Sequence, residues 1–259
     1  MRTGIAIVAA AGLLLVQSLA AQAAAPGPDV VNPANRARYE ACLALTRTAP
    51  QKAFETALAW HDQGGDLAAD HCAAVALVAL GHYDEAAARL ERLAHNLDRI
   101  GSALTPAVLD QAANSWLLAN QPAAAVEDTT AALKLDPKSA DYRIDRARAY
   151  AASGRYGDAA RDLDAVIRLA PGRADAYAYR AAARRRLGDR KGALADADAA
   201  LARDPNSTGA LLERGLLRRD AGDKKGARQD WLRILQLAPG TAVGRAAQSD
   251  LQAMDLAPH

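Results

Sequence analysis

The sequence predicts an all-α protein, and three observations carry that prediction. Alanine, the strongest helix former, makes up roughly a quarter of the 259 residues. Aromatic residues account for only 4% of the chain, so the side chains typical of β-strands are scarce. Prolines recur at intervals of 34 residues, which indicates a repeated structural unit. They stand at Pro137, Pro171, Pro205 and Pro239.

Residues 1–25 are expected to be a signal peptide. Arg2 gives a basic start, an uncharged apolar run follows from Gly4 to Leu19, and the small residues after it offer two A-x-A cleavage sites, 21–23 and 23–25. The run is short for a membrane span, and no basic stop follows it. We therefore expect export to a bacterial periplasm, or alternatively full secretion, with no stable membrane anchor after cleavage.

Residues 26–105 are expected to form an irregular N-terminal helical region. The segment GHYDEAAARLERLA, from Gly81, aligns with GRYGDAARDLDAVI, from Gly154, which predicts one degenerate unit over 67–100. A less regular helix pair is predicted over 35–63. In an oxidising compartment we expect a disulfide between Cys42 and Cys72, with two buried free thiols as the alternative.

Four regular units follow, over 106–139, 140–173, 174–207 and 208–241. Their twentieth residue is always Ala, and their eighth is Ala in three units and Gly215 in the last. Their fifteenth residue is Asn or Gly, which suits the left-handed residue that ends a helix. Each unit is therefore predicted to be two closely packed helices. Residues 242–259 are expected to supply a capping helix and a tail.

This 34-residue pattern resembles the tetratricopeptide repeat (TPR). The resemblance implies a right-handed α-solenoid of stacked helix-turn-helix units that binds a protein or peptide in a concave groove. In that family the first helices line the groove, chiefly through positions two, five, nine, twelve and thirteen. The positions that match here are Asp141, Ile144, Arg148, Asp175, Arg185, Arg186, Leu212, Leu216 and Arg219.

Two kinds of groove chemistry are open at this stage. Residues 136–259 carry a net charge of +6, against −5 for residues 26–135. Arg185 and Arg219 share position twelve, so stacking would align two guanidinium groups that could take a carboxylate or phosphate. That favours, as an alternative function, an accessory subunit that recognises a small anionic or polysaccharide ligand. Otherwise the arginines belong to a solvated face, partly neutralised by aspartates.

Charged residues also recur inside the units. Position twenty-three is Asp in all four, and position seven is Arg in three, with Ala112 as the exception. We predict a recurring ion pair between these two columns, inside a unit or across a junction. At position eleven, Arg184 and Arg218 replace aromatic residues, and we expect their charged heads to reach solvent.

No enzyme motif stands out. The sequence has no nucleophile elbow, phosphate-binding loop, zinc-protease motif or dinucleotide fingerprint, and its five His share no metal-ligand spacing. We therefore expect no catalysis, cofactor or metal. Net charge is only +2 and no ladder of aromatic and basic residues occurs, which argues against nucleic acid. Self-association is left open.

Overall fold

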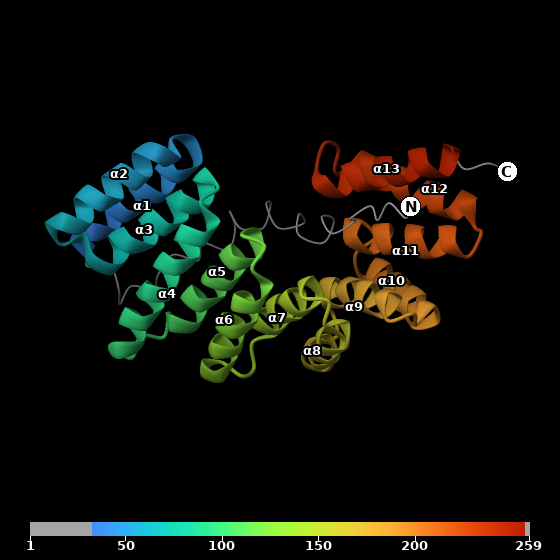
Figure 1. Cartoon of the computed structure of the whole chain (residues 1–259), viewed down its shortest axis with the longest axis horizontal. Helices are drawn as coiled ribbons and strands as arrows, with labels where there is room; N and C mark the ends of the chain where they lie inside the picture. The colour runs from blue at the N-terminus through green and yellow to red at the C-terminus, as the bar shows by residue number, and fades with distance from the viewer. Residues whose placement is uncertain (1–32, 257–259) are drawn as a thin grey trace, which may run out of the picture. The chain divides into compact units, whose positions relative to one another are not determined.

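The structure is a computed structural model that describes residues 33–256, and the described part of the chain is α-helical without β-strands (Figure 1). The expected signal peptide lies outside these residues. The described residues begin with four α-helices, and a π-helical turn, η1 (His61–Gly65), joins the second to the third. The four helices are α1 (Pro33–Thr48), α2 (Pro50–Trp60), α3 (Asp66–Leu80) and α4 (Tyr83–Arg99).

The nine helices that follow make four helical hairpins and a last single helix. They are α5 (Thr105–Leu118), α6 (Pro122–Leu135), α7 (Ala140–Ala152), α8 (Tyr156–Leu169), α9 (Ala174–Arg186), α10 (Arg190–Arg203), α11 (Thr208–Asp220), α12 (Lys224–Leu237) and α13 (Ala242–Leu256). The fold is the expected α-solenoid of stacked helix-turn-helix repeats, and α13 packs on α11 and α12 as its last helix.

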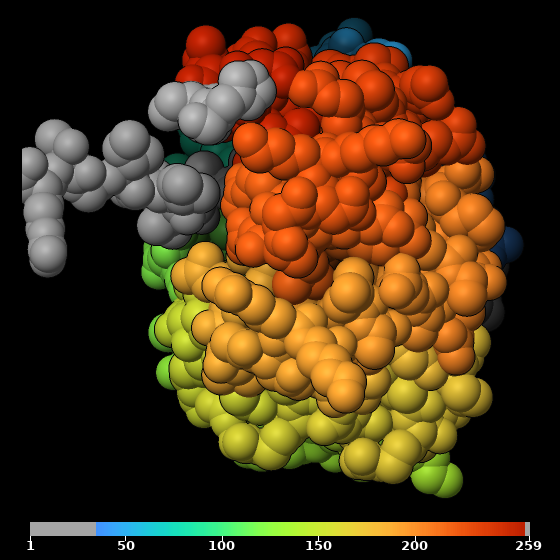
Figure 2. Space-filling model, turned by 90° about the vertical axis from the view of Figure 1, so that its right-hand side faces the viewer, coloured from blue at the N-terminus to red at the C-terminus, as the bar shows by residue number. Residues whose placement is uncertain are grey.

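The helices form two compact units, which divide between Ala149 and Tyr150, inside α7. The N-terminal unit holds α1 to α6 and most of α7. The C-terminal unit holds the end of α7 and α8 to α13, and Figure 2 shows one face of it, where side chains of neighbouring helices form a closed surface.

Left-handed residues end the first helix of each regular repeat. Gly154, Gly188 and Gly222 have φ of 74°, 85° and 86°, and Asn120 has φ of 58°. Most side chains with a Cβ are strained in this region, but glycine adopts it freely and asparagine tolerates it, which explains why the fifteenth position is Gly or Asn.

Small residues let the two helices of each repeat approach closely. The alanines at position twenty are completely buried in all four repeats. The exception at position eight has a specific cause, because a Cβ on Gly215 would lie 2.4 Å from Nε1 of the buried Trp231. The large indole of Trp231 therefore requires glycine where the other repeats carry alanine.

The N-terminal unit is cross-linked covalently. Cys42 on α1 and Cys72 on α3 form the predicted disulfide, with 6.2 Å between their Cα atoms. Nearby, the Tyr39 hydroxyl and Nδ1 of the buried His71 share a hydrogen bond of 2.7 Å, and Nε2 of His71 contacts Oε1 of Gln111 at 2.7 Å. Burial lowers the pKa of His71. The neutral imidazole thus links α1, α3 and α5.

Candidate functional site

The nine residues expected in the groove lie on three first helices. Asp141, Ile144 and Arg148 lie on α7 in the N-terminal unit, and the other six lie on α9 and α11 in the C-terminal unit. We call the exposed and half-buried side chains along the first helices of either unit its first-helix row. Ile144 does not belong to that row, because its side chain is buried in the core.

In the C-terminal unit the position-twelve arginines bind carboxylates of the next first helix. Arg185 Nε donates to Glu213 Oε2 at 2.6 Å, which joins α9 to α11. Arg219 Nη1 donates to Asp250 Oδ1 at 3.0 Å, which joins α11 to α13. These pairs favour the second of the two interpretations, arginines neutralised by acidic neighbours, over two guanidinium groups open to an anion. Both charges are balanced within the chain, and each pair holds neighbouring first helices together.

Burial and charge act together on these pairs. Burial alone would lower the pKa of Arg185, but the hydrogen bond and charge of Glu213 outweigh it and raise that pKa. Burial raises the pKa of Asp250, and the nearby Arg219 and Arg185 oppose the rise. Charged groups held this way are fixed in position before any partner arrives.

The remaining groove positions of the C-terminal unit are also engaged. The Arg186 guanidinium lies over the ring of Tyr156, 4.9 Å from its centroid. Asp175 accepts from Arg173 at 2.6 Å. Leu212 and Leu216 are partly buried against the core of this unit. The row is therefore mainly polar and charged, with apolar patches between the charges.

The N-terminal unit carries a more acidic arrangement between α5 and α7. Arg148 binds Asp145 and donates to Asn114 Oδ1 at 3.1 Å. Asn114 Nδ2 in turn donates to the backbone oxygen of Asp110 at 3.0 Å. Burial, followed by the charge of Asp145, raises the pKa of Asp110 well above its usual range. Arg148 therefore neutralises the buried Asp145, while the Asp110 carboxyl group beside it is held by the amide of Asn114.

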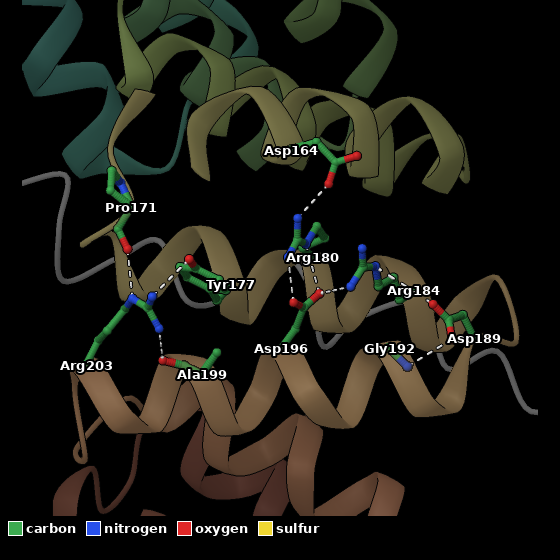
Figure 3. A network of polar contacts seen from close by, with 10 residues as sticks. All are labelled: Asp164, Pro171, Tyr177, Arg180, Arg184, Asp189, Gly192, Asp196, Ala199 and Arg203. Carbon is green, nitrogen blue, oxygen red and sulfur yellow. Dashed lines mark hydrogen bonds and ion pairs between the residues drawn. The ribbon is translucent and has the colours of Figure 1, made fainter. Parts of the chain in front are cut away.

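A separate network joins positions seven, eleven and twenty-three of the repeats (Figure 3). Arg180 forks onto Asp196 of its own repeat, with Nε and Nη2 at 2.9 and 2.7 Å from the two carboxylate oxygens. Its third nitrogen, Nη1, donates to Asp164 of the preceding repeat at 2.6 Å. Arg214 repeats this geometry on Asp230 and Asp198.

The predicted ion pair between positions seven and twenty-three therefore lies inside a repeat, and the same arginine also binds the aspartate at position twenty-five of the preceding repeat. This arrangement also explains why Asp196 and Asp198 stand two residues apart, since Asp196 binds the arginine of its own repeat and Asp198 binds that of the next. The expectation for position eleven is met only in part, since the side chains of Arg184 and Arg218 are 29% exposed. Their guanidinium groups do not extend freely into solvent, because each donates to the buried aspartate of its own repeat, at 2.9 and 2.8 Å.

Sequence reasoning missed the acidic partners of the position-twelve arginines. Glu213 stands at position six of the repeat after Arg185, and Asp250 lies in the last helix. A search for opposite charges between position twelve of one repeat and position six of the next would have found the first pair.

Among residues 33–256, no group of three or more His, Cys, Asp or Glu side chains is placed to bind a metal ion. Over the same stretch, none of the helices combines the length and the apolar character needed to cross a membrane.

Comparison with known families agrees with this architecture. The tetratricopeptide repeat profile matches residues 111–174, 144–189 and 180–242, which together span just over half of the chain. The chain belongs to the tetratricopeptide repeat family. No curated protein matches the sequence significantly.

Solved TPR structures share the fold at low identity. A thermophilic TPR protein of Thermus thermophilus is 22% identical with a TM-score of 0.57, over 70% of this chain and 95% of that one. MamA from Desulfovibrio magneticus RS-1 is 20% identical with a TM-score of 0.53, over 63% of this chain and 90% of that one. At these identities the likeness concerns the fold.

Proposed function

We propose that this TPR protein is a non-enzymatic interaction module that binds a protein or peptide along the first-helix row of its C-terminal unit and acts as an adaptor or assembly factor. The supporting observation is the row of charged side chains fixed by Arg185–Glu213 and Arg219–Asp250. Stacked repeats offer an extended surface, and groups already ordered lose little entropy when a partner binds. Fixed charges of both signs mainly select the partner.

The proposed site of action is the bacterial periplasm, with full secretion as the alternative. Two features support export: the signal-like sequence of residues 1–25 and the Cys42–Cys72 disulfide, a bond typical of oxidising compartments. Cell fractionation together with thiol labelling of the unreduced protein tests this location. A cytosolic, fully thiol-reactive protein would contradict it.

The binding proposal is tested by crosslinking in the native envelope followed by affinity purification. The test variant is Arg185→Glu/Arg186→Glu, which reverses two charges of the row. The matched control is Arg161→Glu on α8, a second helix, where the arginine side chain is 75% exposed. Circular dichroism checks that all three proteins are folded.

We expect one partner to be recovered with the wild type and with Arg161→Glu, and to be lost with the double variant. A partner retained equally by all three would place the interface away from this row. If no partner is recovered with the wild type, the interaction function itself is contradicted.

A further inference from the structure

The carboxylate positions of the arginine networks occur at a third junction. Asp128 of α6 stands at position twenty-three, as Asp196 and Asp230 do. Glu91 of α4 stands at position twenty-five of the preceding degenerate repeat, as Asp164 and Asp198 do in theirs. The Glu91–Asp128 junction therefore has the two acidic groups that elsewhere hold a guanidinium.

Both arginines are missing from this junction. Position seven is Ala112, which is completely buried, and position eleven is Trp116. The single indole N–H of Trp116 donates to Glu91 Oε1 at 2.7 Å. Asp128 is only 8% exposed, and its Oδ2 finds no hydrogen-bond partner within residues 33–256. At the other two junctions the buried aspartate accepts hydrogen bonds on both oxygens.

The charged neighbours of Asp128 are acidic as well, so no positive charge among the described residues compensates its carboxylate. Burial, followed by the charges of Glu91 and Glu127, raises the pKa of Asp128 to about 7, and the indole of Trp116 only partly opposes this. Every charged group that shifts this pKa is acidic, as far as the described part of the chain extends. Glu91 and Trp116 are half-buried and Glu127 is exposed, so the acidic cluster reaches the surface.

We propose that the Glu91–Trp116–Asp128 cluster is a binding site for an arginine side chain supplied by a partner protein. The chain itself shows which group these carboxylate positions accept, since Arg180 and Arg214 satisfy them at the other junctions. An incoming guanidinium would complete the third junction in the same way. The site involves carboxylates of second helices and is separate from the first-helix row.

The geometry at position eleven shows how a partner's guanidinium could approach the Asp128 carboxylate. Arg184 and Arg218 reach the buried aspartates from this position while their side chains are 29% exposed, so a guanidinium at the surface edge can contact the carboxylate. Trp116 occupies that edge here and adds an aromatic ring, a good partner for a planar cation. Arginine fits better than lysine, because two carboxylates on different helices require a forked donor.

The test is a titration of the full exported chain with N-acetyl-arginine amide. The neutral analogue N-acetyl-citrulline amide, which has nearly the same shape, is the control ligand. Binding is followed by the indole N–H NMR signal of Trp116, which the Trp116→Phe variant assigns. The signals of Trp60 and Trp231 report on folding and on unspecific effects.

We expect a saturable shift of the Trp116 signal with the arginine probe and none with the citrulline probe. In Asp128→Asn, where one charge is lost and the shape is kept, affinity should fall about tenfold, the scale of a hydrogen bond to a charged group. Asp196→Asn, at an arginine-bridged junction, should leave the shift unchanged. Trp60 and Trp231 signals like those of the wild type would show that each variant is folded.

A second variant tests the internal comparison. Trp116→Arg supplies from within the chain the guanidinium that Arg184 supplies at its junction, so this variant should no longer bind the probe, as measured by calorimetry. The absence of any Trp116 shift in the wild type, an equal shift with citrulline, or full affinity in Asp128→Asn would each overturn the proposal. Failure of the envelope crosslinking experiment would not affect this result, since no native partner is used.

Discussion

The two units stabilise the same repeat in different ways. In the C-terminal unit, Arg180 and Arg214 each tie a buried aspartate to the carboxylate of the preceding repeat. In the N-terminal unit, the Glu91–Asp128 junction has no such arginine among the described residues, and a disulfide and buried hydrogen bonds lie closer to the chain start. The aspartate at position twenty-three therefore recurs in all four regular repeats, whereas the arginine at position seven that binds it is absent from the first of them.

Loss of the disulfide should have the largest effect and should be confined to one side of the comparison. The bond links cysteines 30 residues apart, for which chain entropy predicts a contribution of about 3–4 kcal/mol to the free energy of unfolding. We expect Cys42→Ser/Cys72→Ser to speed amide hydrogen exchange in α1 and α3 and to leave α9 and α11 protected. Equal loss of protection in both units would contradict the assignment of this bond to the N-terminal unit alone.

Removal of Arg180 should come next. Its side chain is 13% exposed, and Arg180→Ala would leave Asp164 without this partner and Asp196 with fewer donors. We expect the free energy of unfolding to fall by about 2–3 kcal/mol, measured by urea denaturation with circular dichroism. Burial alone would lower the pKa of Arg180, and its two aspartates raise it, so the charge persists at any working pH.

Two control variants test whether the loss of stability in Arg180→Ala comes from its burial and its forked contacts. Arg161→Ala removes a side chain that is 75% exposed and pairs with Asp158, and it should cost less than about 1 kcal/mol. Arg180→Lys keeps the charge but not the fork, and it should recover only part of the loss. A cost for Arg180→Ala no larger than that of Arg161→Ala would mean that the network contributes little to stability.

The smallest expected effect depends on pH and concerns Asp128. Burial and the neighbouring Glu91 and Glu127 raise its pKa from 3.8 to about 7 in the folded chain. The folded protein therefore retains a proton that the unfolded chain releases, so this group's contribution to stability is full below pH 3.8 and is lost as pH rises to about 7. We expect Asp128→Asn to raise the free energy of unfolding by about 1–2 kcal/mol at pH 8 and to change little near pH 4.

Thermal and urea unfolding of both proteins across this pH range provide the measurement. Asp196→Asn is the matched variant, because its carboxylate has the arginines that Asp128 lacks. It should destabilise the protein at pH 8, opposite in sign to Asp128→Asn. The same sign for both variants would remove the distinction between the two kinds of junction.

Much of the fold could be predicted from sequence because each repeat needs the same residue types at the same positions. Alanine at position twenty, a left-handed residue at position fifteen and the recurring proline follow from local sterics, so they are visible as columns. Gly215 is a residue that the repeat columns alone do not explain. Its departure from alanine makes sense only beside Trp231, sixteen residues away on the facing helix.

The candidate site was less predictable. The sequence identified Arg185 and Arg219 as members of one column. Their acidic partners, Glu213 and Asp250, lie on α11 and α13, and only the stacking of these helices brings the charges within contact distance. The Arg184 guanidinium was expected to extend into solvent, yet on a side chain that is 29% exposed it binds the buried carboxylate of Asp196.

The sequence by itself determined the helical class, the 34-residue period and the columns that carry Arg and Asp. These properties depend on backbone propensity and on spacing along the chain, which a single sequence displays. Only the tertiary structure decided which carboxylate each guanidinium binds and which carboxylate is left without one. Those outcomes depend on distances between side chains of different helices and on the loss of water around them, and both arise only when the helices pack.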